Sequence, residues 1–267
     1  MKRSHKKMVL RSVLAVLVIS LALALFLFWP VIRSASSVKR LEDGLYSMNY
    51  SGDYGLEDFI AQGGGSSDMA VADFVIDRLF HGVVNLDLQG NSFGCSTLSV
   101  PGPDSTQLFG RNFDWGACAT LIVQTHPRGG YASISTVNMD FLNLGLNLSE
   151  DASVRLMSAA APYAPMDGMN EKGLCVAVLM IEDRPGFDQN TGKTDLTTTS
   201  AVRLLLDKAA TVDEALALLE QYDLHASAGM MVHFAIADVS GRSVAVEYVN
   251  NEMSVVETPI VTNFYLT

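Results

Sequence analysis

The sequence predicts an α+β domain that follows a single hydrophobic helix. Short runs rich in β-branched and aromatic residues dominate the chain after residue 95. Two stretches with helical periodicity, residues 198–210 and 211–222, separate one group of these runs from another. Strands, then a helix pair, then more strands are typical of layered α+β domains. An apolar run precedes all of them and is long enough to span a membrane.

The apolar run covers residues 12–32 and contains no charged residue. These 21 residues would form a helix of about 31 Å, which matches the thickness of a bilayer core. Five basic residues precede the run, so we expect residues 1–11 in the cytoplasm, residues 12–32 as a single-pass signal anchor and the rest of the chain outside. A cleaved signal peptide is the alternative. Its apolar core is usually shorter, about 7–15 residues, although Ser34-Ala35-Ser36 offers small residues for a signal peptidase.

The segment after the apolar run is polar and rich in turn-forming residues. The stretch Gly63-Gly64-Gly65-Ser66-Ser67 predicts a flexible break. Ser67 or Asp68 then predicts the N-cap of a helix that ends near Gly82.

Strand and helix patterns account for most of the remaining chain. Strands are predicted at residues 96–100, 107–111, 120–125, 132–138, 174–181, 231–239, 243–249, 253–256 and 259–262. Apolar periodicity predicts a helix over residues 198–210, and the capping pattern Thr211-Val212-Asp213-Glu214 predicts a second helix that ends near Tyr222.

Charge is distributed unevenly along the chain and excludes one class of partner. Residues 1–40 hold eight of the 18 Lys and Arg residues and no acidic residue. Residues 41–267 therefore hold 10 basic residues against 29 acidic residues, a net charge of −19. A domain of this charge repels phosphate backbones, so nucleic acid is excluded as a partner. The five His and three Cys residues show no metal-ligand spacing, and no glycine-rich phosphate loop follows a strand, so we expect no cofactor.

The three cysteines are Cys95, Cys118 and Cys175, too few for a disulfide framework. A Cys118–Cys175 pair remains open for a domain outside the cytoplasm. Cys95 follows Gly94 at the point where the strand-rich region begins. A lone cysteine is most often a small buried hydrophobic residue, so the case for a reactive Cys95 depends on the motifs that follow it.

Three short motifs follow Cys95, and each one alone has an ordinary explanation. Phe109-Gly110-Arg111-Asn112-Phe113-Asp114-Trp115 would be an ion pair at a strand end, and Asp167-Gly168-Met169-Asn170-Glu171-Lys172-Gly173-Leu174 a polar turn. Thr262-Asn263 would be a turn after a strand. Together and in this order, they resemble the cysteine branch of the N-terminal-nucleophile hydrolases over residues 95–267. The most similar groups are the choloylglycine (bile salt) hydrolases, the penicillin V acylases and the acid-ceramidase-like lipid amidases.

This resemblance implies a four-layer αββα sandwich that cleaves a linear, non-peptide carbon–nitrogen amide bond. Cys95 would be the nucleophile, and its own α-amine, with a pKa near 8, would be the general base. That amine exists only after a cut between Gly94 and Cys95, which the thiol itself would make, because Gly94 leaves its carbonyl accessible. Residues 33–94 would then be a pro-segment and residues 95–267 the hydrolase domain.

The resemblance also assigns roles to four further residues. Asp114 would orient Cys95, and Arg111 would favour its thiolate. Asn263 and the main-chain N–H of Met180 would donate to the oxyanion. Bile salt hydrolases have an Asn at the position of Met180, which argues against bile salts as the substrate. The family's domain continues well beyond Thr267 and includes a further arginine in the pocket, so the resemblance implies an incomplete domain.

Two other functional classes remain open on the sequence alone. A papain-like cysteine protease would use His126, His225 or His233 with Asn250 or Asn263, although Cys95 lacks the neighbours that are usual in that class. A membrane-tethered binding module on an inactive hydrolase scaffold is the non-enzymatic alternative. The expected partners are a small-molecule acyl amide and a membrane; acyl transfer in place of hydrolysis and a homo-oligomer both stay open.

Overall fold

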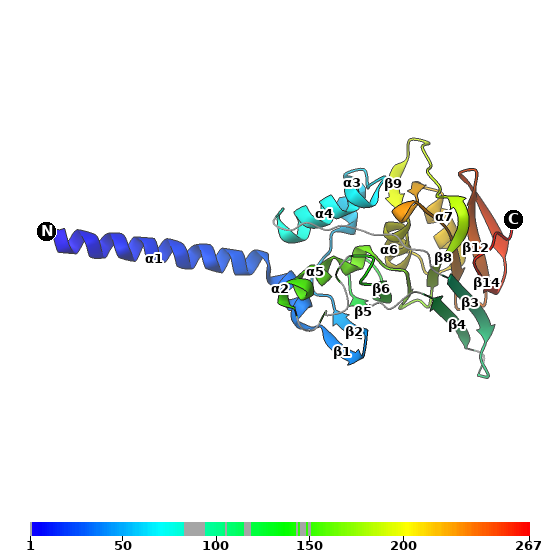
Figure 1. Ribbon diagram of the computed structural model, residues 1–267, viewed down its shortest axis with the longest axis horizontal. Helices are drawn as coiled ribbons and strands as arrows, with labels where there is room; N and C mark the ends of the chain where they lie inside the picture. The colour runs from blue at the N-terminus through cyan, green and yellow to red at the C-terminus, as the bar shows by residue number, and fades with distance from the viewer. Residues whose placement is uncertain are drawn as a thin grey trace.

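The N-terminal helix α1 (Lys2–Leu27) extends away from the part of the chain that holds the other elements (Figure 1). The computed structural model describes residues 2–82, 94–104, 106–114, 119–142, 144, 148 and 151–267. Within α1, the window Leu10–Leu27 has a mean hydropathy of 2.5 and is exposed along its length. It is long and apolar enough to cross a membrane, and a signal sequence would have the same features.

The predicted span of residues 12–32 is divided in the structure. A second helix, α2 (Trp29–Ser36), begins after Phe28 and carries Pro30 in its first turn. Proline has no N–H and its ring crowds the preceding turn, so a helix usually breaks just before it. Val31 and Ala35 are buried, so α2 belongs to the folded domain and only the part before Phe28 projects from it.

A nine-stranded mixed sheet forms the centre of the domain. Its strands, in spatial order, are β1 (Lys39–Glu42), β2 (Leu45–Asn49), β5 (Thr120–Thr125), β6 (Ser133–Asn138), β7 (Asp167–Asn170), β8 (Cys175–Pro185), β11 (Met230–Ala237), β12 (Ser243–Val249) and β13 (Glu252–Glu257). β2 and β5 run parallel, and the other neighbouring pairs are antiparallel. The predicted strands of this region are confirmed, with bounds that shift by a few residues.

The segment before residue 82 is part of this fold, which the sequence did not predict. It supplies β1 and β2 to the sheet, followed by α3 (Leu56–Ala61) and α4 (Asp68–Phe80). The expected helix start is confirmed, because the side chain of Ser67 accepts a hydrogen bond from the N–H of Ala70. The predicted flexible break is wrong, because Gly63 and Gly65 form backbone hydrogen bonds with Asp195.

A second, three-stranded sheet packs on one face of the large sheet. It contains β14 (Ile260–Val261), β3 (Gly94–Pro101) and β4 (Gln107–Asp114), and β3 contacts β8. The strand β7 shows which elements cover each face. Asp167 reaches Arg111 of β4, whereas a β-carbon on the next residue, Gly168, would lie 2.7 Å from Leu206 of α6 (Thr198–Lys208). Successive residues of a strand point to opposite faces, so α6 and the small sheet cover opposite sides of the large sheet.

The remaining elements cover the edges and ends of the sheets. They are α5 (Ala152–Met157), η1 (Ser158–Tyr163), α7 (Val212–Leu219), η2 (Ser227–Gly229) and the two-stranded parallel sheet of β9 (Thr194–Thr197) and β10 (Tyr222–His225). The two predicted helices of this region, α6 and α7, are confirmed, and the N–H of Glu214 donates to the Thr211 hydroxyl at the start of α7. An α+β fold with mixed sheets is therefore confirmed, and the fourth layer of the αββα sandwich stays a prediction.

Candidate active site

Cys95 is the second residue of β3 and lies at the interface between the two sheets. In the β3–β4 pair it stands opposite Phe113, and Thr97 stands opposite Arg111. Residues two apart on a strand share a face, so Cys95 and Arg111 are diagonal neighbours on the side that packs against β8. Arg111 Nη2 lies 3.4 Å from the sulfur of Cys95.

Arg111 is held in place by two further groups. Its Nη1 forms an ion pair of 2.8 Å with Oδ2 of Asp167, and its Nη2 donates to the carbonyl of Val178 at 3.0 Å. The other carboxylate oxygen of Asp167 accepts from the Thr136 hydroxyl at 2.6 Å. Asp167 opens a motif that the sequence singled out, but its role was not predicted, because only the packing of the two sheets brings it to Arg111.

The strand β8 supplies backbone groups to the site because it is longer than its neighbour β7. The N–H of Val178 donates to Met166, the residue before β7 begins. In an antiparallel pair, residues two apart direct their N–H and C=O groups to the same edge. The carbonyl of Val178 and both backbone groups of Met180 therefore lie at a sheet edge that β7 does not cover, and there they meet side chains from the small sheet.

Asn263 joins this open edge to the nucleophile. It follows β14, and its Oδ1 accepts a hydrogen bond of 2.6 Å from the backbone N–H of Cys95. Its Nδ2 donates to the carbonyl of Met180 at 2.5 Å. A carboxamide has two N–H groups, so this bond leaves a second donor for the oxyanion role that the resemblance assigns to Asn263.

Asp114 lies at the end of β4, opposite Gly94 rather than opposite Cys95. Its Oδ1 accepts from the side-chain amide of Asn112 at 2.7 Å. Its Oδ2 lies 3.4 Å from the point where a β-carbon on Gly94 would be. The carboxylate therefore stands beside the bond between residues 94 and 95, and its negative charge contributes to the raised pKa of the Cys95 thiol.

The thiol of Cys95 is held in its protonated form in the uncut chain. Burial raises its pKa to about 11, although the Arg111 guanidinium and the backbone N–H groups of Asp114 and Met180 act in the opposite direction. Buried thiols are inert unless a base or a positive charge overcomes the cost of desolvation. The site thus provides partners for a thiolate, and none of the histidines among the described residues is placed to generate it.

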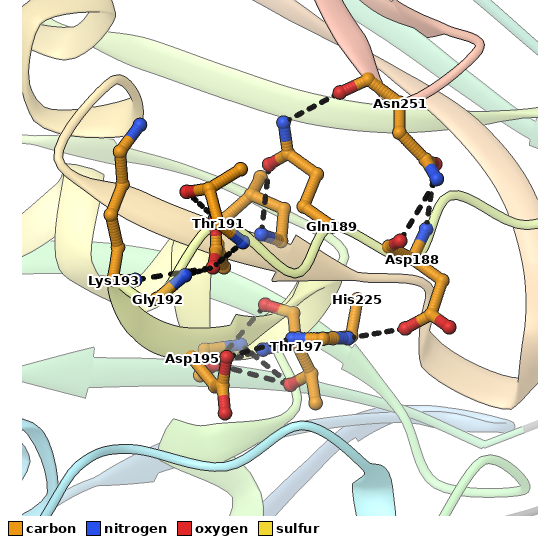
Figure 2. Close-up of polar contacts among 12 residues, drawn as sticks. Asp188, Gln189, Thr191, Gly192, Lys193, Asp195, Thr197, His225 and Asn251 are labelled. Atoms are coloured by element: carbon orange, nitrogen blue, oxygen red, sulfur yellow. Dashed lines mark hydrogen bonds and ion pairs between the residues drawn. The ribbon is translucent and has the colours of Figure 1, made fainter.

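The histidines of the papain-like alternative are engaged elsewhere. His225 lies between Asp188 and Asp195, at 2.7 and 3.0 Å from its two ring nitrogens (Figure 2). The ring nitrogens of His233 contact Glu247 and the carbonyl of Thr262. His126 is exposed. Since the ring nitrogens of His225 and His233 already have partners, neither ring is directed at Cys95 as a base.

The other two cysteines and the aromatic end of the Arg111 motif add no group to the described site. Trp115 and Cys118 lie outside the described residues, and Cys175 is a free thiol. Among the residues that the structure describes, no three His, Cys, Asp or Glu side chains gather to hold a metal ion.

Comparison with known proteins gives one family and a set of solved structures. A family model described as linear amide C–N hydrolases, choloylglycine hydrolase family, matches residues 95–263. A variant of the conjugated bile acid hydrolase from Clostridium perfringens is similar in structure, with 20% identity, 62% of this chain and 52% of that chain covered, and a TM-score of 0.46. The penicillin V acylase from Agrobacterium tumefaciens shows 18% identity, coverage of 67% and 47%, and a TM-score of 0.36. The chain thus spans about half the length of these two proteins.

Proposed function

Because the chain belongs to the choloylglycine hydrolase family of linear amide C–N hydrolases, we propose that it cleaves an N-acyl amide with Cys95 as the nucleophile. One observation carries this proposal. The sulfur of Cys95 lies beside Arg111, and the nitrogen of the same residue is bound by Asn263. Both reacting atoms that an N-terminal nucleophile needs are therefore held by side chains of the matched region.

The first step is a cut between Gly94 and Cys95. The Cys95 sulfur attacks the Gly94 carbonyl, a thioester forms, the carbon–nitrogen bond breaks and the released amine takes the thiol proton. Water then hydrolyses the thioester, which leaves a carboxylate on Gly94 and restores the thiol. A peptide nitrogen cannot accept a proton at neutral pH, whereas an α-amine has a pKa near 8, so this step supplies the base that the buried thiol lacks.

Amide hydrolysis then follows the same chemistry on a substrate. The α-amine takes the thiol proton, the thiolate attacks the amide carbonyl, and the ammonium returns the proton to the departing amine. Water hydrolyses the acyl thioester and releases the acid. Arg111 stabilises the negative sulfur, and the N–H of Met180 and the free N–H of Asn263 donate to the oxyanion. Asn263 Oδ1 and Asp114 orient the α-amine.

The two chains that the cut produces are expected to stay together. β2 lies between β1 and β5 inside the nine-stranded sheet, so its removal would expose an internal sheet edge. The hydroxyl of Tyr54 donates to the buried carboxylate of Asp207, at 2.6 and 2.7 Å from its two oxygens. Asp207 in turn pairs with the fully buried Arg203, so Tyr54 of the first chain supplies a hydrogen-bond donor to a buried ion pair of the catalytic chain.

If the two chains stay together, the N-terminal helix can anchor the catalytic chain to a membrane. With α1 as a signal anchor, residues 1–11 remain in the cytoplasm and the domain lies outside. The retained residues 33–94 then tether the catalytic chain to the membrane surface after the cut. An active site held at that surface suits an amphipathic acyl amide, whose acyl chain partitions into the bilayer while its amide stays near the water.

Mass spectrometry of the purified full-length protein tests the proposal. We expect two chains, residues 1–94 and 95–267, that elute as one complex under native conditions and release the dye from a fluorogenic N-lauroyl aminocoumarin. Cys95→Ala should remain one chain and lose hydrolysis, whereas Cys175→Ala, a matched change of a second free buried thiol, should behave like the wild type. An uncut chain together with undiminished hydrolysis by Cys95→Ala would reject the nucleophile.

A further inference from the structure

A histidine of β11 and a glutamate of β12, both fully buried, lie opposite each other in the large sheet. The register that pairs Phe234 of β11 with Val246 of β12 places His233 opposite Glu247. The side chains of both residues are 0% exposed. A buried ionisable pair is often no more stabilising than well-packed apolar side chains, so its presence here points to a task other than stability.

This pair binds the segment that carries Asn263 at two points. His233 Nε2 lies 2.6 Å from the carbonyl of Thr262, the residue just before Asn263. Glu247 Oε1 accepts from the backbone N–H of Leu266 at 2.8 Å, and its Oε2 accepts from the N–H of Thr267 at 3.1 Å. The pair therefore holds the chain on both sides of Asn263.

The hydrogen bonds of the pair also stabilise the carboxylate form of Glu247. The Thr262 carbonyl can only accept, so Nε2 of His233 carries a proton. Burial alone raises the pKa of Glu247, but hydrogen bonds from Thr267, Leu266 and His233 together hold it below its ordinary value. Nδ1 of His233 lies 3.1 Å from Oε1 of this carboxylate, so the ring and the carboxylate belong to one hydrogen-bond network.

We propose that His233 and Glu247 are positioning residues that fix residues 262–267, and through them the side chain of Asn263, between the Cys95 nitrogen and the Met180 carbonyl. This inference rests on the proposed function of the site. Asn263 lies two residues beyond the two-residue strand β14, which alone gives it little support. A displacement of about 1 Å at a reacting group can lower a rate about 100-fold, so such support matters for catalysis.

The chain offers a matched control in His225. It is also a largely buried histidine between acidic side chains, Asp188 and Asp195, but its contacts lie in the region of β9 and β10 (Figure 2). A change of His225 therefore removes a comparable interaction without touching residues 262–267.

The experiment compares His233→Gln, Glu247→Gln and His225→Gln in the full-length protein. We expect the two changes of the pair to lower kcat for N-lauroyl aminocoumarin by about 10- to 100-fold, with KM within about threefold of the wild type. They should also slow the cut at Gly94, while His225→Gln keeps the wild-type kcat and cutting rate. Thermal unfolding, measured in parallel, shows whether a variant with a lower kcat and an unchanged KM is still folded. If His233→Gln does not fold, Glu247→Gln alone still tests the inference.

Two results would overturn the inference, and they can be told apart. If the wild type hydrolyses the probe and both changes of the pair keep kcat within about twofold, the positioning role is wrong and the proposed function stands. If the wild type is neither cut nor active, the proposed function itself fails, and the positioning role with it.

Discussion

Cys95 and Cys175 are both buried, free thiols, and they differ in what surrounds them. Burial raises the pKa of each to about 11. Within the described part of the chain, the one hydrogen-bond partner of the Cys175 sulfur is the Gly173 carbonyl, at 3.9 Å. The Cys95 sulfur instead faces a guanidinium and two backbone N–H groups. A raised pKa therefore does not distinguish a reactive thiol from a structural one in this fold. The distinction lies in the donors that would stabilise a thiolate once a base becomes available.

The largest expected effect comes from removal of the cation beside Cys95. Arg111→Gln should lower kcat/KM for the fluorogenic amide about 100- to 1,000-fold, because the thiolate loses its nearest positive charge. It should also lower the free energy of unfolding by about 3 kcal/mol, because Asp167 is left without its ion-pair partner. Steady-state kinetics and denaturant unfolding measure the two effects separately.

A second substitution distinguishes these two effects. In Arg111→Gln/Asp167→Asn the orphaned carboxylate is gone, so stability should recover in part while activity stays low. Recovery of activity in the double variant would mean that Arg111 acts only as a counter-charge for Asp167, and the contrast between the two cysteines would lose its main support.

A smaller effect should appear in the reactivity of the two thiols. In Gly94→Val the branched side chain crowds the carbonyl and should slow the cut, while its β-carbon keeps an ordinary contact with Asp114. In that uncut chain a pKa of about 11 leaves roughly one thiol in ten thousand ionised at pH 7, so both cysteines should react slowly with iodoacetamide and faster as the pH rises to 10.

In the processed wild type, the two thiols should no longer react with iodoacetamide at similar rates. The new α-amine should make Cys95 react at pH 7 at least about 100-fold faster than Cys175, as measured by peptide mass spectrometry of alkylated protein. Equal rates at the two positions in a fully cut protein would contradict the proposed base.

Local patterns of the sequence predicted most of the strands but not the strands at one end of the sheet. Alternation of apolar and polar residues is visible in β5 and β6, because one face of each is buried. β1 has the sequence Lys-Arg-Leu-Glu and is exposed throughout, so no periodicity marks it. β2 is a strand because β5 lies beside it, which is a property of the tertiary fold rather than of five residues.

The residues of the candidate site were also predicted only in part. The order of short motifs pointed to Cys95, Arg111 and Asn263, and the structure brings these three together. The resemblance also named the N–H of Met180, but the carbonyls of Val178 and Met180 as partners of Arg111 and Asn263 were not predicted, because they depend on where β7 begins relative to β8. The pairing of His233 with Glu247 in the core was not predictable either, because it depends on the register of β11 and β12.

The smallest expected effect is a change of stability at Cys175. Cys175→Ala should cost about 1 kcal/mol of unfolding free energy at pH 7, because a buried sulfur is lost.

The folded-state pKa of Cys175, about 11, lies above the unfolded value near 9, so the wild-type thiol contributes stability below pH 9 and loses it as the pH rises toward 11. The loss amounts to roughly 1.3 kcal/mol between pH 8 and pH 10. The two proteins should therefore become equally stable near pH 10 in denaturant unfolding. A difference that stays constant over this range would show that Cys175 is less strongly desolvated than Cys95, and burial would then distinguish the two thiols after all.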